Sequence, residues 1–167
     1  MSNHLGYLQL FSYQQHILLL IYQLVAQITS QLQKYPLGLS IDFSYLIYFG
    51  VSGDGDSLSI GFGQFGHAVR RNLNMLYIIE NNGVYGLTKG QLSPTTQMGG
   101  QTSTSPVGSI DRPVEPISLA LSMGATFVAR AVDIDQANLR NVLERAAMHK
   151  GTSLIEIYQN CHIFNDG

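Results

Sequence analysis

From residue 51 onward, apolar runs alternate with segments whose apolar residues recur at helical spacing. The runs are rich in β-branched and aromatic residues, as is typical of buried strands; one ends near Ser52, and the others span 74–80, 126–133 and 152–159. We expect helices between them, over about 57–72, 114–124 and 135–150. Strands that alternate with helices predict an α/β fold with a doubly wound parallel sheet.

Two of these predicted helices have one clear apolar face, which we expect to be buried against the sheet. In the first helix, that face consists of Leu58, Phe62, Phe65 and Val69. The last helix begins at an acidic cap, either Asp133 or Asp135. Its apolar face consists of Leu139, Val142, Leu143, Ala146 and Ala147.

The segment 81–112 is predicted to be a loop, because Gly, Ser, Thr, Pro and Gln dominate it. Loops of this length are uncommon in compact domains and are often functional. We therefore expect part of a binding site in this segment.

The first 50 residues differ from the rest, since Asp42 is their only acid and Lys34 their only Lys or Arg. A helix over 14–33 is possible, although its apolar residues do not form a single face. One interpretation is an ordinary helix that is buried or covered by a partner. The other is a segment that is not the native start of the domain. We accordingly divide the chain into an atypical segment, 1–50, and a domain, 51–167.

Composition and charge narrow the class of protein. Hydrophobic residues make up 45% of the chain and charged residues 12%, which is typical of a globular protein. The net charge is −2 and no basic block exceeds Arg70-Arg71, so we expect no nucleic-acid binding. The most apolar run, 17–26, is too short to span a bilayer, and no signal peptide is evident. A single cysteine, Cys161, fits a reducing compartment, so we expect a cytoplasmic protein.

The stretch "SGDGDS" places Asp54 and Asp56 between glycines, where a strand ends and a helix begins. Gly53 and Gly55 allow a ligand to approach the backbone, and helix N-termini favour phosphate. Bare carboxylates would repel a phosphate, but Mg²⁺ bound to Asp54 would also bind phosphate oxygens. The turn therefore predicts a metal–diphosphate site.

A second stretch, "IIENNGVYG", offers further oxygen ligands one strand–helix–strand unit later. The side chain of Asn82 and the carbonyl of Val84 follow the next strand, and parallel neighbours bring their ends together. A calcium loop is a poor alternative, because Leu58 stands where such a loop needs an oxygen ligand. Both stretches can also be simple turns, as isolated Gly-Asp and Asn-Gly pairs usually are.

GDG followed by an Asn-containing turn resembles the thiamine diphosphate-binding motif. The wider stretches "GDGDSLSIGFGQFGHAVRRNLNMLYIIENNGVYGLTKGQLSPTT" and "EIYQNCHIFNDG" resemble the β subunit of 2-oxoacid:ferredoxin oxidoreductases. The likeness covers roughly 52–167. It implies a thiamine diphosphate-binding fold and a role in the oxidative decarboxylation of a 2-oxoacid to acyl-CoA.

The resemblance also implies roles for individual residues. It makes Asp54, Asn82 and the Val84 carbonyl the ligands of Mg²⁺. Leu87 is the residue found in enzymes that act on 2-oxoglutarate or on several 2-oxoacids, so 2-oxoglutarate is favoured. Lys89 would contact the substrate carboxylate, or else be a solvated loop lysine. The implied cofactor-binding residues are Gly53, Asp54, Gly55, Asp56, Ser57, Asn82, Val84, Tyr85, Gly86, Leu87 and Thr88.

The implied partners are the α subunit, ferredoxin, coenzyme A and a 2-oxoacid. The acid that activates the cofactor is expected on the α subunit, so no catalytic residue is assigned here and Glu80 is interpreted as a strand-end residue. The family also holds a [4Fe–4S] cluster, for which Cys161 would be a ligand only in an intact chain, because one thiolate cannot hold four irons. The alternatives are a non-redox thiamine diphosphate lyase or synthase, which needs no cluster, and an inactive fragment.

Overall fold

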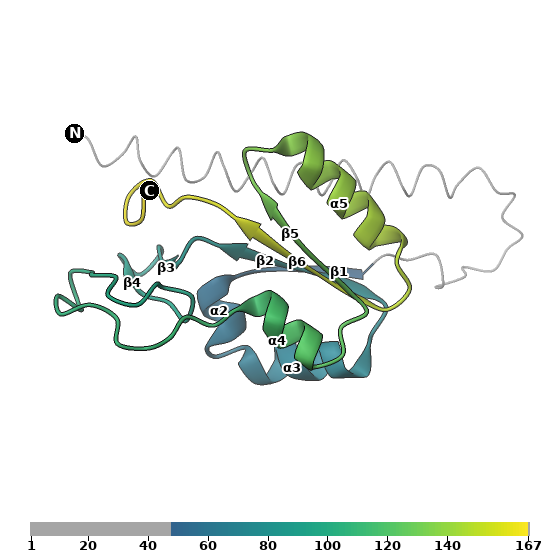
Figure 1. Cartoon of the computed structure of the whole chain (residues 1–167), viewed down its shortest axis with the longest axis horizontal. Coiled ribbons are helices and arrows are strands. Elements are labelled where there is room, and N and C mark those ends of the chain that lie inside the picture. The colour runs from purple at the N-terminus through teal and green to yellow at the C-terminus, as the bar shows by residue number, and fades with distance from the viewer. Residues whose placement is uncertain (1–47, 167) are drawn as a thin grey trace, which may run out of the picture.

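The computed structural model describes residues 48–166, which form a four-stranded parallel sheet with helices on both faces. Its strands lie in the order β1-β2-β6-β5. Figure 1 shows α5 on one side of the sheet and α2, α3 and α4 on the other, so the predicted doubly wound α/β fold is confirmed. The strands of the sheet are β1 (Tyr48–Gly53), β2 (Met75–Asn81), β5 (Phe127–Val132) and β6 (Thr152–Tyr158).

The two central strands are apolar because helices cover them on both sides. The side chains of Ile78, Ile79, Leu154, Ile155 and Ile157 in β2 and β6 are fully buried. Alternate residues contribute to two separate clusters, one on each face of the sheet. The strand positions read from the sequence are thus confirmed to within one or two residues.

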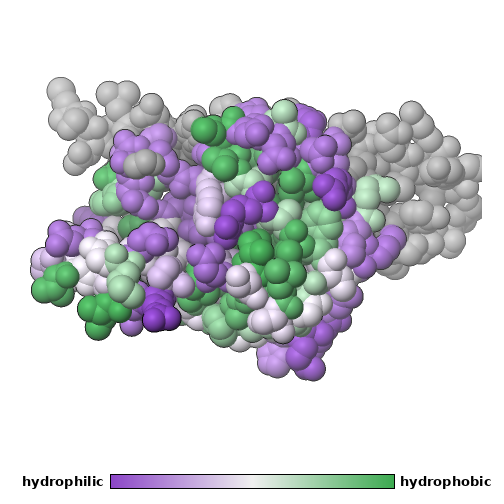
Figure 2. Space-filling model, viewed as in Figure 1, coloured by the Kyte–Doolittle hydropathy of each residue, from purple (hydrophilic) through white to green (hydrophobic). Residues whose placement is uncertain are grey.

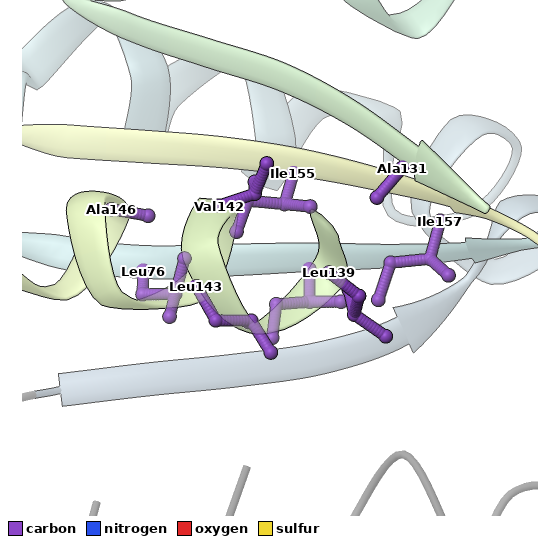
Figure 3. Close-up of a cluster of buried hydrophobic side chains, with 9 residues drawn as sticks. Leu76, Ala131, Leu139, Val142, Leu143, Ala146, Ile155 and Ile157 are labelled. Carbon is purple, nitrogen blue, oxygen red and sulfur yellow. The ribbon is translucent and has the colours of Figure 1, made fainter. Parts of the chain in front are cut away.

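Helix α5 (Gln136–Met148) begins at Asp135, whose carboxylate accepts a hydrogen bond from the Asn138 N–H at 3.1 Å. Of the two predicted caps, Asp135 is therefore the correct one. Figure 3 shows the apolar face of α5 packed against the sheet, as predicted. Ala147, at the margin of this face, is only partly buried.

The predicted single helix over 57–72 is wrong: the chain forms a short α2 (Asp54–Leu58) and a separate α3 (Phe62–Arg71). At the break, the Gly61 N–H donates to the Asp56 carbonyl at 2.8 Å. A side chain at Gly61 would place its Cβ 2.6 Å from that same oxygen, so this turn requires glycine. The break changes the helical phase and leaves Phe62 39% exposed. The other three residues of the predicted apolar face, Leu58, Phe65 and Val69, are buried.

The remaining predictions concern the loop and the N-terminal half. The segment 81–112 is not entirely irregular, because β3 (Val84–Tyr85) and β4 (Gln91–Leu92) pair as a short antiparallel hairpin. Helix α4 (Pro116–Ser122) follows, one turn shorter than predicted. The possible helix over 14–33 lies outside the described residues, and β1 begins at Tyr48, before the predicted domain boundary. Within residues 48–166, no helix is long and apolar enough to cross a membrane.

Candidate functional site

The predicted site residues follow the carboxyl ends of β1 and β2, which are neighbours in the sheet. Gly53, the last residue of β1, lies opposite Glu80 of β2 in the register, so Asp54 and Asn82 come directly after paired strand ends. Figure 1 shows the arrowhead of β2 pointing toward the β3–β4 hairpin, and that of β6 pointing toward the C-terminal segment at the same end of the molecule. This edge of a parallel sheet is where α/β proteins bind ligands.

Asp54 is the first residue of α2, and its side chain is almost completely buried, at 2% exposure. The hydroxyls of Ser93 and Thr95 lie 2.6 and 2.5 Å from its Oδ2 atom. Oδ1 takes part in neither bond. The carboxylate is therefore held in place by one oxygen, while the other is left for a further ligand.

Sequence reasoning did not find Ser93 and Thr95 as site residues, although they belong to the "SPTT" stretch of the family likeness. They lie about forty residues after Asp54 along the chain, and no local pattern links them to it. Only the fold, which returns the end of the hairpin to the start of α2, brings them into contact.

Gly55 is required by a contact within the protein. The Tyr85 hydroxyl donates to the Gly55 carbonyl at 2.9 Å, and a Cβ at Gly55 would lie 2.3 Å from the Tyr85 ring. At Gly53, by contrast, an added Cβ meets nothing within 4 Å. The predicted need for glycine thus has a structural reason at Gly55, where it lets Tyr85 pack across the start of α2.

The other two predicted diphosphate residues point in different directions. The carboxylate of Asp56 is exposed and accepts a hydrogen bond from the Ser52 hydroxyl at 2.6 Å. The side chain of Ser57 is buried, with its hydroxyl 3.2 Å from that of Tyr77. Contact of either residue with a diphosphate stays a prediction.

Two consecutive asparagines shape the turn after β2. Oδ1 of Asn81 accepts the Gly83 N–H, and Oδ1 of Asn82 accepts the Val84 N–H, both at 3.1 Å. Gly83 has a positive φ of 70°, which glycine adopts without strain. The Asn165 side chain donates to the Asn82 carbonyl at 2.8 Å and ties the turn to the C-terminal segment.

The predicted metal ligands have the chemistry that Mg²⁺ prefers. They offer one carboxylate and two neutral oxygens from adjacent strand ends. An amide oxygen has two lone pairs, so the bond to the Val84 N–H leaves one on Asn82. Among residues 48–166, no three His, Cys, Asp or Glu side chains are grouped for metal binding, and the expected set contains a single carboxylate. The residues fit the ion, and Mg²⁺ binding stays a prediction.

Residues 86–90 form the tip of the β3–β4 hairpin. The Lys89 and Gly90 N–H groups close it by donating to the carbonyls of Gly86 and Tyr85, and the side chain of Gln91 is hydrogen-bonded to Thr88. Leu87 is 99% exposed, and Lys89 is exposed with a φ of 79°. This tip is available to a cofactor, a substrate or a partner.

A cavity of about 700 Å³ adjoins the turn after β2 and extends along the ends of β6 and β5. Asn82, Thr95, Glu115 and Tyr158 are among its lining residues. The loop between β4 and α4 borders it and exposes Met98, Val107 and Ile110 to solvent. Figure 2 shows hydrophobic residues at the surface of this end of the molecule.

Cys161 follows β6 and is buried. Its backbone pairs with Asn165, and its Sγ atom lies 3.7 Å from where a Cβ at Gly86 would be. Nδ1 of His162 lies 3.3 Å from the Asp166 carboxylate. As the only cysteine of the chain, Cys161 does not fit the ligand set of a [4Fe–4S] cluster.

Comparison with known proteins identifies the class to which this site belongs. Residues 37–157 match the family described as "Thiamine pyrophosphate enzyme, C-terminal TPP binding domain". The chain therefore belongs to this family of thiamine pyrophosphate enzymes, and within it to the relatives of the β subunits of 2-oxoacid:ferredoxin oxidoreductases. The match begins at residue 37, upstream of the stretch in which the sequence showed a likeness.

Two relatives illustrate this membership. The 2-oxoglutarate oxidoreductase subunit KorB of Mycobacterium tuberculosis is 52% identical over 130 residues, which are 78% of this chain and 35% of that protein. The 2-oxoacid:ferredoxin oxidoreductase subunit beta of Saccharolobus solfataricus is 47% identical over 114 residues, 68% of this chain and 37% of that protein. The resemblance stated from the sequence is confirmed.

A solved structure supports the same conclusion. The 2-oxoglutarate:ferredoxin oxidoreductase from Magnetococcus marinus, with 2-oxoglutarate, coenzyme A and succinyl-CoA bound, matches with a TM-score of 0.66 and 40% identity. The match covers 68% of this chain and 39% of that one. The chain thus spans little more than a third of the length of these relatives.

Proposed function

We propose that this chain is the cofactor-binding core of a 2-oxoacid:ferredoxin oxidoreductase β subunit and binds thiamine diphosphate through Mg²⁺. The observation that carries this proposal is the buried Asp54, with one oxygen held by Ser93 and Thr95 at the end of β1. The Mg²⁺ ligands would be Asp54, Asn82 and the Val84 carbonyl. The backbone from Gly53 to Ser57 would lie along the diphosphate.

The proposed reaction is the oxidative decarboxylation of a 2-oxoacid to acyl-CoA, with ferredoxin as electron acceptor. Bound thiamine diphosphate would supply the nucleophilic carbon and the electron sink for loss of CO₂. The residues of this chain would hold the diphosphate and orient the ring end of the cofactor toward the hairpin tip. Leu87 and the relatives named for 2-oxoglutarate favour that substrate. Lys89, exposed at the same tip, is the proposed partner of a substrate carboxylate.

The α subunit is proposed to complete the active site. It would supply the activating acid and cover the exposed Leu87 together with the apolar residues of the loop between β4 and α4. Exposed apolar clusters commonly mark protein interfaces. We accordingly propose no complete turnover by this chain alone, and a cytoplasmic location. No step is assigned to an iron–sulfur cluster, because one cysteine does not fit it.

Calorimetric titration of thiamine diphosphate into the full chain tests the cofactor site. With Mg²⁺ present we expect saturable binding in the micromolar range, and with EDTA we expect this binding to disappear. Asp54→Ala should abolish the Mg²⁺-dependent binding while the circular dichroism spectrum stays unchanged. Binding that is equal with and without Mg²⁺, or equal in wild type and Asp54→Ala, would contradict the proposal.

A further inference from the structure

A fully buried carboxylate in β6 lies behind the turn that carries the proposed Mg²⁺ ligands. Glu156 has 0% exposure, and its Oε1 atom accepts a hydrogen bond from Nδ2 of Asn81 at 2.7 Å. Its Oε2 atom accepts a hydrogen bond from Nε of Arg130 at 2.7 Å and forms an ion pair with a terminal nitrogen of the same guanidinium, also at 2.7 Å. Every oxygen of this carboxylate is thus committed within the protein.

Arg130 is itself fixed from two further sides. Its guanidinium donates to the Glu115 carboxylate at 3.1 Å and lies 4.7 Å from the centre of the Tyr158 ring. Partial burial lowers the pKa of Arg130, but the hydrogen bond and charge of Glu156, with help from Glu115, outweigh it and raise this pKa above its ordinary value. Arg130 therefore presents only hydrogen-bond donors, so it requires an acceptor at Oε2 of Glu156.

Glu156 decides which way the Asn81 amide faces. Because Glu156 accepts, the NH₂ group of Asn81 points toward it and the carbonyl oxygen points away. That oxygen accepts the Gly83 N–H at 3.1 Å and lies 2.9 Å from the Thr95 hydroxyl. The first contact shapes the turn with Asn82 and Val84. In the second, the single Thr95 proton is shared between Oδ1 of Asn81 and Oδ2 of Asp54, so the amide also borders the group that holds Asp54.

We infer that Glu156 is a positioning residue for the metal–diphosphate site, acting through the amide of Asn81. This inference rests on the proposed function. Groups that orient metal ligands from behind commonly change metal affinity by about 10- to 100-fold when they are altered. Glu156 is such a group because it sets the orientation of the Asn81 amide. That amide contacts both the turn that carries Asn82 and the Thr95 hydroxyl beside Asp54.

The effect of Glu156→Gln follows from the donors around it. Arg130 needs an acceptor, so the new glutamine must turn its oxygen to Arg130 and its NH₂ group to position 81. Two NH₂ groups repel, so the Asn81 amide flips and the Gly83 N–H loses its acceptor. Asn81→Asp in the otherwise unchanged chain should do similar damage, because two carboxylates would then face each other across 2.7 Å.

The double variant, Glu156→Gln with Asn81→Asp, reverses the donor and acceptor between the two positions and keeps the net charge of the wild type. The new glutamine donates to one oxygen of the new aspartate, whose other oxygen accepts the Gly83 N–H. We therefore expect each single variant to lose the wild-type geometry of the turn after β2, and the double variant to regain it. A merely structural loss of packing would not be repaired in this way.

Two readouts on the full chain test this expectation. Amide hydrogen exchange at Gly83, followed by ¹⁵N NMR without any ligand, reports the turn itself. Calorimetry with thiamine diphosphate and Mg²⁺ reports the site. We expect each single variant to lose Gly83 protection and to bind about 10- to 100-fold more weakly. The double variant should return to within about threefold of wild type in both readouts.

Glu144→Gln, which makes the same chemical change at an exposed position of α5, is the matched control and should alter neither readout. Unchanged exchange and binding in Glu156→Gln would overturn the inference, as would a folded double variant that is as impaired as the singles. If a single variant fails to fold, comparison of the double variant with wild type in the two readouts still tests the inference. If the wild type binds no thiamine diphosphate, the proposed function fails, while Gly83 exchange continues to test the role of Glu156.

Discussion

Asp54 is a buried carboxylate, and the two hydrogen bonds that it accepts from the described part of the chain are both to one oxygen. Burying a carboxylate is costly unless hydrogen bonds, a helix start or a cation compensates for the lost water. Ser93, Thr95 and the beginning of α2 supply the first two kinds of compensation. The free oxygen is where a cation would supply the third, which makes the two hydroxyls as important to the proposed site as the acid itself.

Thr95→Val keeps the shape of the side chain and removes its hydroxyl. We expect Mg²⁺-dependent binding of thiamine diphosphate to weaken by about 10- to 100-fold, because the Asp54 carboxylate loses the donor that orients it. Calorimetry measures the affinity. Thr104→Val, in the same loop, is the control, because within residues 48–166 the Thr104 hydroxyl is hydrogen-bonded only to that of Thr102. Equal affinities for wild type and Thr95→Val would show that this hydroxyl does not support a metal ligand.

Tyr158, under the Arg130 guanidinium, has a pKa above its ordinary value because burial and the charge of Glu156 both disfavour the phenolate. Because the pKa of Tyr158 is higher in the folded chain than in the unfolded one, its contribution to stability is fully present below about pH 10, the ordinary pKa of tyrosine. This contribution is lost as the pH rises through the pKa of the folded state. Urea unfolding between pH 8 and 11 should therefore show a steeper loss of stability in wild type than in Tyr158→Phe. Parallel curves for the two proteins would contradict the shift.

At the scale of elements, the sequence predicts the strands and helices that depend on local pattern. It does not predict features that depend on contacts between residues far apart in the chain. The apolar runs predict the strands because residues such as Ile78 and Ile155 are buried on both faces of the sheet. The exposure of Phe62 could not be predicted, because the break at Gly61 depends on a backbone bond to Asp56. The roles of Thr95 and Glu156 could not be read either, since their partners lie far away along the chain.

The first turn of α2 offers a test at this scale. Gly55→Ala would place a Cβ 2.3 Å from the Tyr85 ring, so the ring or α2 must move, and we expect a loss of about 1–3 kcal/mol in the free energy of unfolding. Gly63→Ala in α3 meets nothing within 4 Å and should stabilise the chain by about 0.5–1 kcal/mol. Denaturant titration of both variants measures these values. A neutral Gly55→Ala would mean that Tyr85 does not pack on α2.

At the scale of the whole molecule, the chain combines a complete sheet edge with an open surface around it. The ends of β1 and β2 bring together the proposed cofactor ligands, while Leu87, Val107 and Ile110 remain largely exposed near the same end. These surfaces are consistent with our proposal that this chain binds the cofactor and that the α subunit completes the active site.

A crystal structure of the chain with thiamine diphosphate and Mn²⁺ in place of Mg²⁺ tests the proposed site most directly, because the anomalous signal locates the metal. We predict one peak about 2.0–2.3 Å from an Asp54 carboxylate oxygen, from Oδ1 of Asn82 and from the Val84 carbonyl oxygen. The diphosphate should lie between this peak and the start of α2. A peak elsewhere, or a bound diphosphate that does not contact the ends of β1 and β2, would contradict it.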